Sequence, residues 1–122
     1  MLDGLREFFT LLQRDRALSP RSRRSTFEGS LQELRDELAE LDAAHAKGDP
    51  ASIRAELGDV LWVVLFLMIL GAEKGLGTPA EVVAGALAKL ERRKPWLASG
   101  DVPSEAEEAQ LWQEAKRKER EG

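Results

Sequence analysis

Hydrophobic and polar positions along the chain follow helical spacings almost throughout. The clearest case is a stripe of leucines three and four residues apart, at Leu31, Leu34, Leu38 and Leu41. No segment shows the sustained alternation of apolar and polar residues that marks a strand, and no Asn-Gly hairpin signal is present. The pattern predicts an all-α fold of about five helices, near residues 2–14, 26–47, 50–75, 79–94 and 104–120.

The predicted helix ends carry residues that cap or interrupt helices. Residues 25–28, 78–81 and 104–107 fit capping boxes, in which a hydroxyl and a carboxylate satisfy free backbone N–H groups. Gly48 suits the end of one helix and Pro50 the first position of the next, while Pro95 ends the fourth. Between the helices we expect a basic loop over residues 14–25 and a turn over residues 98–103.

The third predicted helix is apolar on every side from Val60 to Leu70. A helix without a polar face must be surrounded, and four short neighbours in a small chain can hardly enclose it. We therefore expect a single domain over residues 1–122, with a four-helix core that is completed by oligomerisation as a homodimer or homotetramer.

Composition narrows the setting of this bundle. Among 122 residues, 18 are basic and 22 acidic, and the resulting net charge of -4 disfavours general binding to nucleic acid or to an anionic membrane. The apolar run Val60–Leu70 is shorter than the roughly 20 residues of a bilayer span. Without cysteine there is neither a disulfide nor a thiolate metal site. We expect a cytoplasmic protein.

Two pairs of acidic residues repeat one spacing on consecutive helices. Glu37 and Glu40 are three residues apart, as are Glu56 and Asp59, so each pair shares a helix flank. If the helices are antiparallel neighbours joined at Gly48, the two pairs lie level with each other. The alternative is that all four are ordinary surface acids.

Carboxylates that face one another need a cation, because two unit charges about 4 Å apart repel by roughly 1 to 4 kcal/mol. Oxygen ligands without histidine or cysteine favour Mg²⁺, Mn²⁺ or Ca²⁺ over Zn²⁺. On the fourth helix, Lys89, Arg92 and Arg93 share a face and suit contacts with a polyphosphate. They equally suit the negative end of the helix dipole.

These residues match the signature of a known family. The sequence resembles the MazG-type nucleoside triphosphate pyrophosphohydrolases of the all-α NTP pyrophosphatase superfamily. The family pattern E-E-x-x-E on one helix and E-x-x-D on the next is similar to residues 36–40, Asp-Glu-Leu-Ala-Glu, and residues 56–59, Glu-Leu-Gly-Asp. The segments 89–95 and 100–116 also resemble the family.

The resemblance implies a hydrolase that cleaves NTP or dNTP to a nucleoside monophosphate and pyrophosphate by attack of a metal-activated water. It implies Mg²⁺, with Mn²⁺ as a substitute, on Glu37, Glu40, Glu56 and Asp59. It further implies phosphate contacts from Lys89, Arg92 and Arg93, with Asp36 and Glu37 as catalytic residues. Glu33 is the alternative to Asp36 as the base that accepts the proton of the water.

Departures from the family pattern leave the substrate open. Asp36 stands where the family usually has Glu, Leu87 where many members have Asn, and the Cys-Pro-Trp-Asp loop before the second helix is absent. Two alternatives therefore remain: a dUTPase-like or phosphoribosyl-ATP pyrophosphatase of the same superfamily, and a non-catalytic helical oligomerisation or regulatory module.

Overall fold

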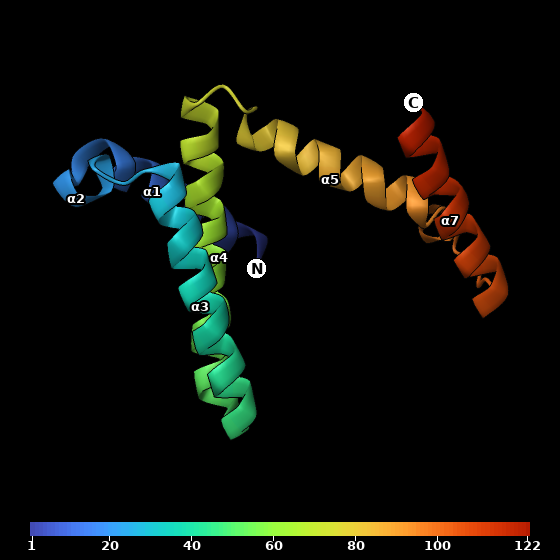
Figure 1. Cartoon of the computed structure of the whole chain (residues 1–122), viewed down its shortest axis with the longest axis horizontal. Helices are drawn as coiled ribbons and strands as arrows, with labels where there is room; N and C mark the ends of the chain where they lie inside the picture. The colour runs from blue at the N-terminus through green and yellow to red at the C-terminus, as the bar shows by residue number, and fades with distance from the viewer. The chain divides into compact units, whose positions relative to one another are not determined.

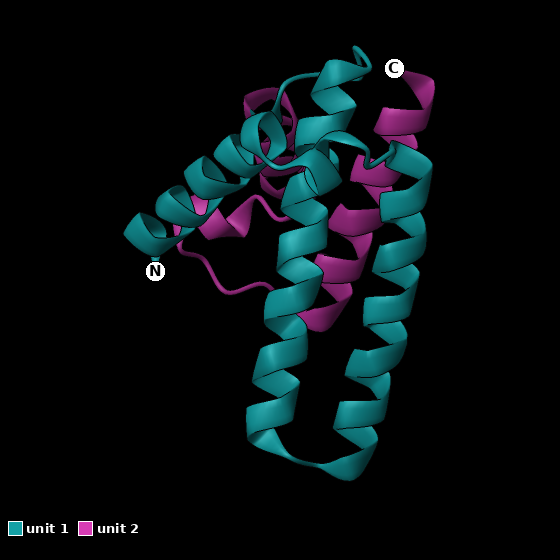
Figure 2. Cartoon of the chain, turned by 90° about the vertical axis from the view of Figure 1, so that its left-hand side faces the viewer, with its two compact units in different colours: residues 1–79 teal, residues 80–122 magenta.

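The structure, a computed structural model, describes all residues 1–122 and contains seven helices and no strand. The all-α expectation is confirmed. Contacts divide the chain into two compact units, residues 1–79 and 80–122 (Figures 1 and 2). The single domain expected over residues 1–122 stays a prediction, as does its completion by oligomerisation.

The first unit is built on a long helical hairpin. Helix α3 (Phe27–Lys47) and helix α4 (Pro50–Glu73) run side by side in opposite directions (Figure 2). The turn between them is set by its residues: Gly48 takes a left-handed conformation at φ 71°, and the Asp49 carboxylate accepts a hydrogen bond from the backbone N–H of Ala51. The hairpin predicted from this turn is confirmed.

Helix α1 (Leu2–Leu18) and the short helix α2 (Pro20–Arg23) complete this unit. The predicted loop over residues 14–25 is wrong, because residues 14–18 contain no glycine or proline and continue the helix. Ser19 and Pro20 then start α2, and the Ser19 hydroxyl accepts a hydrogen bond from the Ser22 N–H. The segment is therefore mostly helical, with Ser22 buried and most of its arginines exposed.

The second unit contains α5 (Pro79–Arg93), the single turn α6 (Trp96–Ser99) and α7 (Glu105–Glu121). The capping box predicted at Ser104 is present, with reciprocal hydrogen bonds between Ser104 and Glu107. At the box predicted over residues 25–28, Thr26 rather than Ser25 caps the helix. The predicted turn near Ala98 begins as α6.

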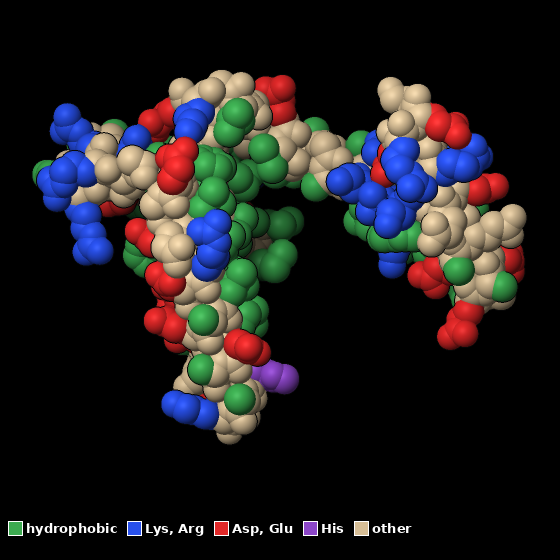
Figure 3. Space-filling model, in the orientation of Figure 1, with side chains coloured by type: hydrophobic (Ala, Val, Ile, Leu, Met, Phe, Trp, Pro, Cys, Tyr) green, Lys and Arg blue, Asp and Glu red, His purple; other side chains and the backbone are tan.

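The core of the first unit is small and centred on α4. Its buried apolar side chains are Leu12, Ala44, Val63, Phe66, Ile69 and Leu70. Other apolar residues of α4 are exposed, among them Leu57, Leu61 and Val64, and Figure 3 shows hydrophobic side chains along this side of the hairpin. By length and composition alone α4 is able to span a membrane, and 28% of its most apolar window is buried in the chain.

Candidate metal centre and active site

Four carboxylates meet where α3 and α4 face each other. Glu37 and Glu40 come from α3, and Glu56 and Asp59 come from α4. Each residue offers one oxygen, and these four oxygens all lie within 4.8 Å of one another. The antiparallel hairpin therefore brings the two pairs level with each other, at the place where α4 enters its apolar stretch.

The four carboxylates repel one another and are partly shielded from water. Burial, followed by the hydrogen bond and charge of Glu40, raises the pKa of Glu37 to about 7. Burial, and then the charges of Glu40 and Asp59, also raises the pKa of Glu56. The Oε2 atoms of Glu37 and Glu56 are buried and accept no hydrogen bond. No lysine or arginine forms an ion pair with any of the four.

These carboxylates fit a hard divalent cation. Buried anionic oxygens without a donor are costly unless a cation satisfies them. In an octahedral Mg²⁺ site, oxygen ligands at about 2.1 Å place opposite ligands about 4.2 Å apart. The observed spread of 4.8 Å requires only a small contraction to reach that geometry. The set contains no histidine or cysteine, so it does not resemble a zinc site.

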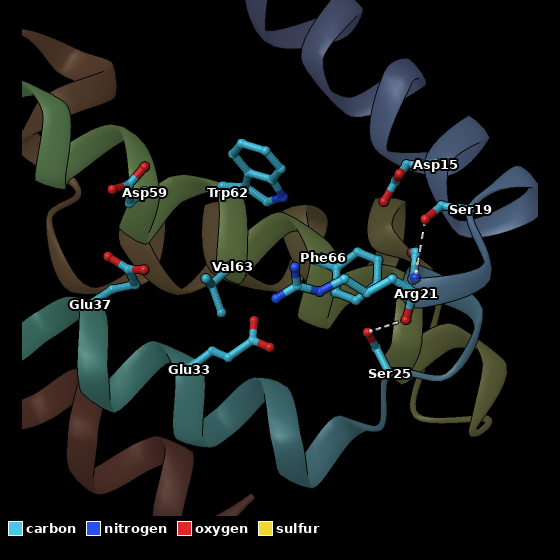
Figure 4. A pocket seen from close by; sticks show the side chains of 11 residues that line it. Asp15, Ser19, Arg21, Ser25, Glu33, Glu37, Asp59, Trp62, Val63 and Phe66 are labelled. Carbon is cyan, nitrogen blue, oxygen red and sulfur yellow. Dashed lines mark hydrogen bonds between the residues drawn. The ribbon is translucent and has the colours of Figure 1, made fainter.

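A cavity of about 420 Å³ adjoins the carboxylates (Figure 4). Glu37 and Asp59 line one end of it, and residues of α1 and α2 line the other, including Asp15, Ser19 and Arg21. Figure 4 shows the Arg21 side chain extending into the cavity toward Glu33. The cavity thus combines an acidic end at the cluster with a mixed polar end that carries one guanidinium group.

The two candidate bases occupy different positions on α3. Glu33 lines the cavity together with Glu37. The Asp36 carboxylate is exposed, accepts a hydrogen bond of 3.0 Å from Gln32 Nε2, and does not line the cavity. The structure therefore brings Glu33, and not Asp36, to the side of the carboxylate cluster.

The predicted phosphate contacts lie in the second unit, near the end of α5. Arg92 Nη2 lies 3.1 Å from Glu119 Oε1, and Arg93 Nη2 lies 2.9 Å from Glu119 Oε2. The Arg93 and Arg92 guanidinium groups lower the pKa of the Glu119 carboxyl. Lys89 forms no ion pair. Figure 3 shows lysine and arginine side chains gathered over this unit.

Comparison with known proteins decides the family. Residues 25–98 match the family model of the MazG nucleotide pyrophosphohydrolase domain, which is more than half of the chain. The chain belongs to the MazG family. Membership implies nucleotide pyrophosphohydrolase activity, which is hydrolysis of an acid anhydride.

A solved structure supports the MazG fold. The crystal structure of a mazG-related protein from Thermotoga maritima is similar to this chain with a TM-score of 0.87 and 23% sequence identity. The match covers 92% of this chain and 98% of that one. No curated protein matches the chain. At this level of identity the likeness shows the fold alone.

The MazG match includes the four carboxylates and Lys89, Arg92 and Arg93, but it excludes α1, α2 and α7. Two features were not anticipated from the sequence. Trp62, which lies in the apolar run Val60–Leu70, is 52% exposed, lines the cavity and meets Phe8 edge-on at 6.0 Å between ring centres. Glu119, which bridges two arginines, carried no recognisable signal among the many acids of its helix.

Proposed function

We propose that this protein is a Mg²⁺-dependent nucleoside triphosphate pyrophosphohydrolase that converts NTP or dNTP to a nucleoside monophosphate and pyrophosphate. The observation that carries the proposal is the group of four carboxylate oxygens within 4.8 Å of one another, on the helices that the MazG match covers. The orphaned, buried Oε2 atoms of Glu37 and Glu56 support a resident cation at that point.

In this proposal Glu37, Glu40, Glu56 and Asp59 hold Mg²⁺, which Mn²⁺ can replace because it accepts the same oxygen ligands. When bound, the ion neutralises charge on the polyphosphate and lowers the pKa of the attacking water.

The remaining residues supply proton transfer and phosphate binding. Glu33 accepts the proton of the water, since its side chain lines the cavity beside Glu37, and Asp36 is the alternative base. Lys89, Arg92 and Arg93 neutralise the phosphates. Water attacks the α-phosphorus, and the bond from that phosphorus to the bridging oxygen breaks, so that pyrophosphate leaves.

The adjoining cavity of about 420 Å³ suits the nucleoside part of the substrate. Trp62 offers a partly exposed ring beside Asp59, and Arg21 offers donors at the far end. The lining has both polar and apolar parts, as a nucleoside does.

Product analysis tests the proposal. A panel of NTPs and dNTPs, including dUTP and phosphoribosyl-ATP, is incubated with the protein and Mg²⁺ or Mn²⁺, and the products are separated by ion-exchange chromatography. We expect a monophosphate and pyrophosphate from at least one substrate, and loss of at least about 100-fold in activity for Glu56→Gln, because charge stabilisation contributes that much in related chemistry. Inorganic phosphate with a diphosphate would contradict the reaction. Full activity of Glu56→Gln would contradict the metal assignment.

We further propose that the protein is a cytoplasmic homodimer or homotetramer. Leu57, Leu61 and Val64 leave apolar surface on α4, and Glu56 and Asp59 on the same helix are costly inside a bilayer. Another copy is therefore a better cover for α4 than lipid. Light scattering on Leu61→Glu is expected to show a smaller species than wild type, whereas Leu2→Glu on the exposed end of α1 is expected to leave the assembly intact. A wild-type monomer would refute the assembly.

A further inference from the structure

The basic cluster at the end of α5 is organised by one acid of α7. The two oxygens of the Glu119 carboxylate are divided between neighbouring arginines: Oε1 accepts from Arg92 at 3.1 Å and Oε2 from Arg93 at 2.9 Å. The side chains of Glu119 and Arg93 are 21% and 20% exposed, whereas that of Arg92 is 53% exposed. One arginine of the pair is thus enclosed and the other faces solvent.

Arg93 is held from more than one side. Besides its bond to Glu119, its guanidinium lies 4.8 Å from the centre of the Trp112 ring, within the range of a cation–π contact. Its Nε atom is buried and makes no hydrogen bond. Because its side chain is only 20% exposed, Arg93 presents little of its guanidinium to a phosphate while it stays on the Trp112 ring and on Glu119. Arg93 therefore anchors α7 to the end of α5.

Arg92 remains available to a ligand. It uses one N–H on Glu119, and a guanidinium has five donors in a fixed plane, so four remain. Lys89 lies three residues earlier on the same helix face and forms no ion pair. The carboxylate also offsets the repulsion between the adjacent guanidinium groups and restricts the rotamers that Arg92 can adopt.

We propose that Glu119 is a positioning residue for phosphate binding. By bridging Arg92 and Arg93, it orients Arg92 to act with Lys89 on the substrate's phosphates, while Arg93 serves as the anchor. The inference rests on the proposed pyrophosphohydrolase function. It leaves Lys89 and Arg92 as direct phosphate contacts and removes Arg93 from that role. It also gives α7, which lies outside the MazG match, a part in substrate binding without contact to the substrate.

The direct test is a double-mutant cycle on pyrophosphate binding, measured by isothermal titration calorimetry in the presence of Mg²⁺. Glu119→Gln keeps the side-chain shape, and we expect it to raise the Kd for pyrophosphate about tenfold, since misplacing one charge-assisted hydrogen bond costs at least that factor. If Glu119 acts through Arg92, adding Glu119→Gln to Arg92→Gln produces no further rise.

Kinetics give the second readout. For Glu119→Gln we expect KM for the triphosphate to rise about tenfold with kcat within a factor of about two, and Glu119→Asp to recover part of the loss. The matched control is Glu121→Gln, which removes an acid of the same helix whose partner is Arg117. It is expected to behave as wild type in both assays.

The outcomes separate the two proposals. Unchanged Kd and KM in Glu119→Gln, or additive effects in the cycle, would overturn the positioning role. A lower Kd would overturn it as well, because Glu119 would then be a competitor of phosphate for Arg92. Pyrophosphate binding that depends on Glu119 in a protein without pyrophosphohydrolase activity would overturn the proposed function alone.

Discussion

Removing one of the four clustered carboxylates is expected to change stability in opposite directions with and without Mg²⁺. Glu56→Gln keeps the shape of the side chain and removes one charge. In wild type the Oε2 of Glu56 is buried without a hydrogen-bond partner, and burial, then the charges of Glu40 and Asp59, raises its pKa. In EDTA the variant loses this repulsion, so we expect it to unfold at a higher temperature than wild type.

With Mg²⁺ the order reverses. An ion that binds only the folded protein, at about 100 times its Kd, adds about 2.7 kcal/mol to the free energy of unfolding. For 122 residues, an unfolding entropy of about 2.1 cal/mol/K per residue gives about 0.26 kcal/mol/K in total. The wild-type Tm is therefore expected to rise by about 10 °C. Glu56→Gln retains three of the four ligands and should gain only a small part of this.

The assay is a thermal melt followed by circular dichroism, at one protein concentration, in EDTA and across a Mg²⁺ titration. Asp42→Asn is the matched control, because Asp42 is an exposed acid of α3 outside the cluster. It should follow wild type at every Mg²⁺ concentration. An equal rise in Tm with Mg²⁺ in wild type and Glu56→Gln would refute the metal assignment. A wild-type Tm that does not change with Mg²⁺ would refute it as well.

Three further outcomes are expected. The pKa of Glu37 is raised from 4.5 to about 7, so between these values the folded protein binds more protons than the unfolded chain. Urea titrations in EDTA should show stability falling as pH rises through this window and levelling off above it, with a smaller fall for Glu37→Gln. In the same titrations Leu70→Ala, at a site 3% exposed, should lower the free energy of unfolding by about 2–5 kcal/mol. Leu2→Ala, at a site 72% exposed, should leave it almost unchanged. Arg16 pairs with Glu73 of α4 and donates hydrogen bonds to the carbonyls of Ser22 and Ser25, which line the cavity. Arg16→Ala should therefore lower the free energy of unfolding by about 1–3 kcal/mol and raise KM. An unchanged KM would show that these contacts do not affect substrate binding.

The hairpin and the carboxylate cluster were predictable because a short turn fixes their relation. With Gly48, Asp49 and Pro50 ending one helix and starting the next, few alignments of the two helices remain, and the repeated three-residue spacing then places four carboxylates together. The signals are local ones: a left-handed glycine, a capping aspartate and a helical period. The boundaries of α3 and α4 lie within two residues of the prediction for the same reason.

Contacts between residues distant in sequence were not predictable. The apolar run of α4 does not say which of its sides meets α1 and α3, so the half-exposed position of Trp62 at the cavity does not follow from it. Leu38, a member of the leucine stripe, is likewise 48% exposed. The pairing of Arg92 and Arg93 with Glu119 joins residues 26 and 27 positions apart, and nothing in the spacing of α7 distinguishes Glu119 from its neighbouring acids.

Glu56 and Asp59 are acidic residues in a helix that is otherwise strongly apolar. The helix reaches a mean hydropathy of 2.0 over its most apolar window, yet Glu56 and Asp59 stand at the start of its apolar stretch. Neither residue has a basic partner, and the packing of α3 brings two more carboxylates against them. As a design for stability alone this arrangement is unfavourable, because apolar residues at these positions would add to a small core without mutual repulsion. A cation reverses that balance, and the same helix then supplies both the buried core of the first unit and half of the proposed metal site.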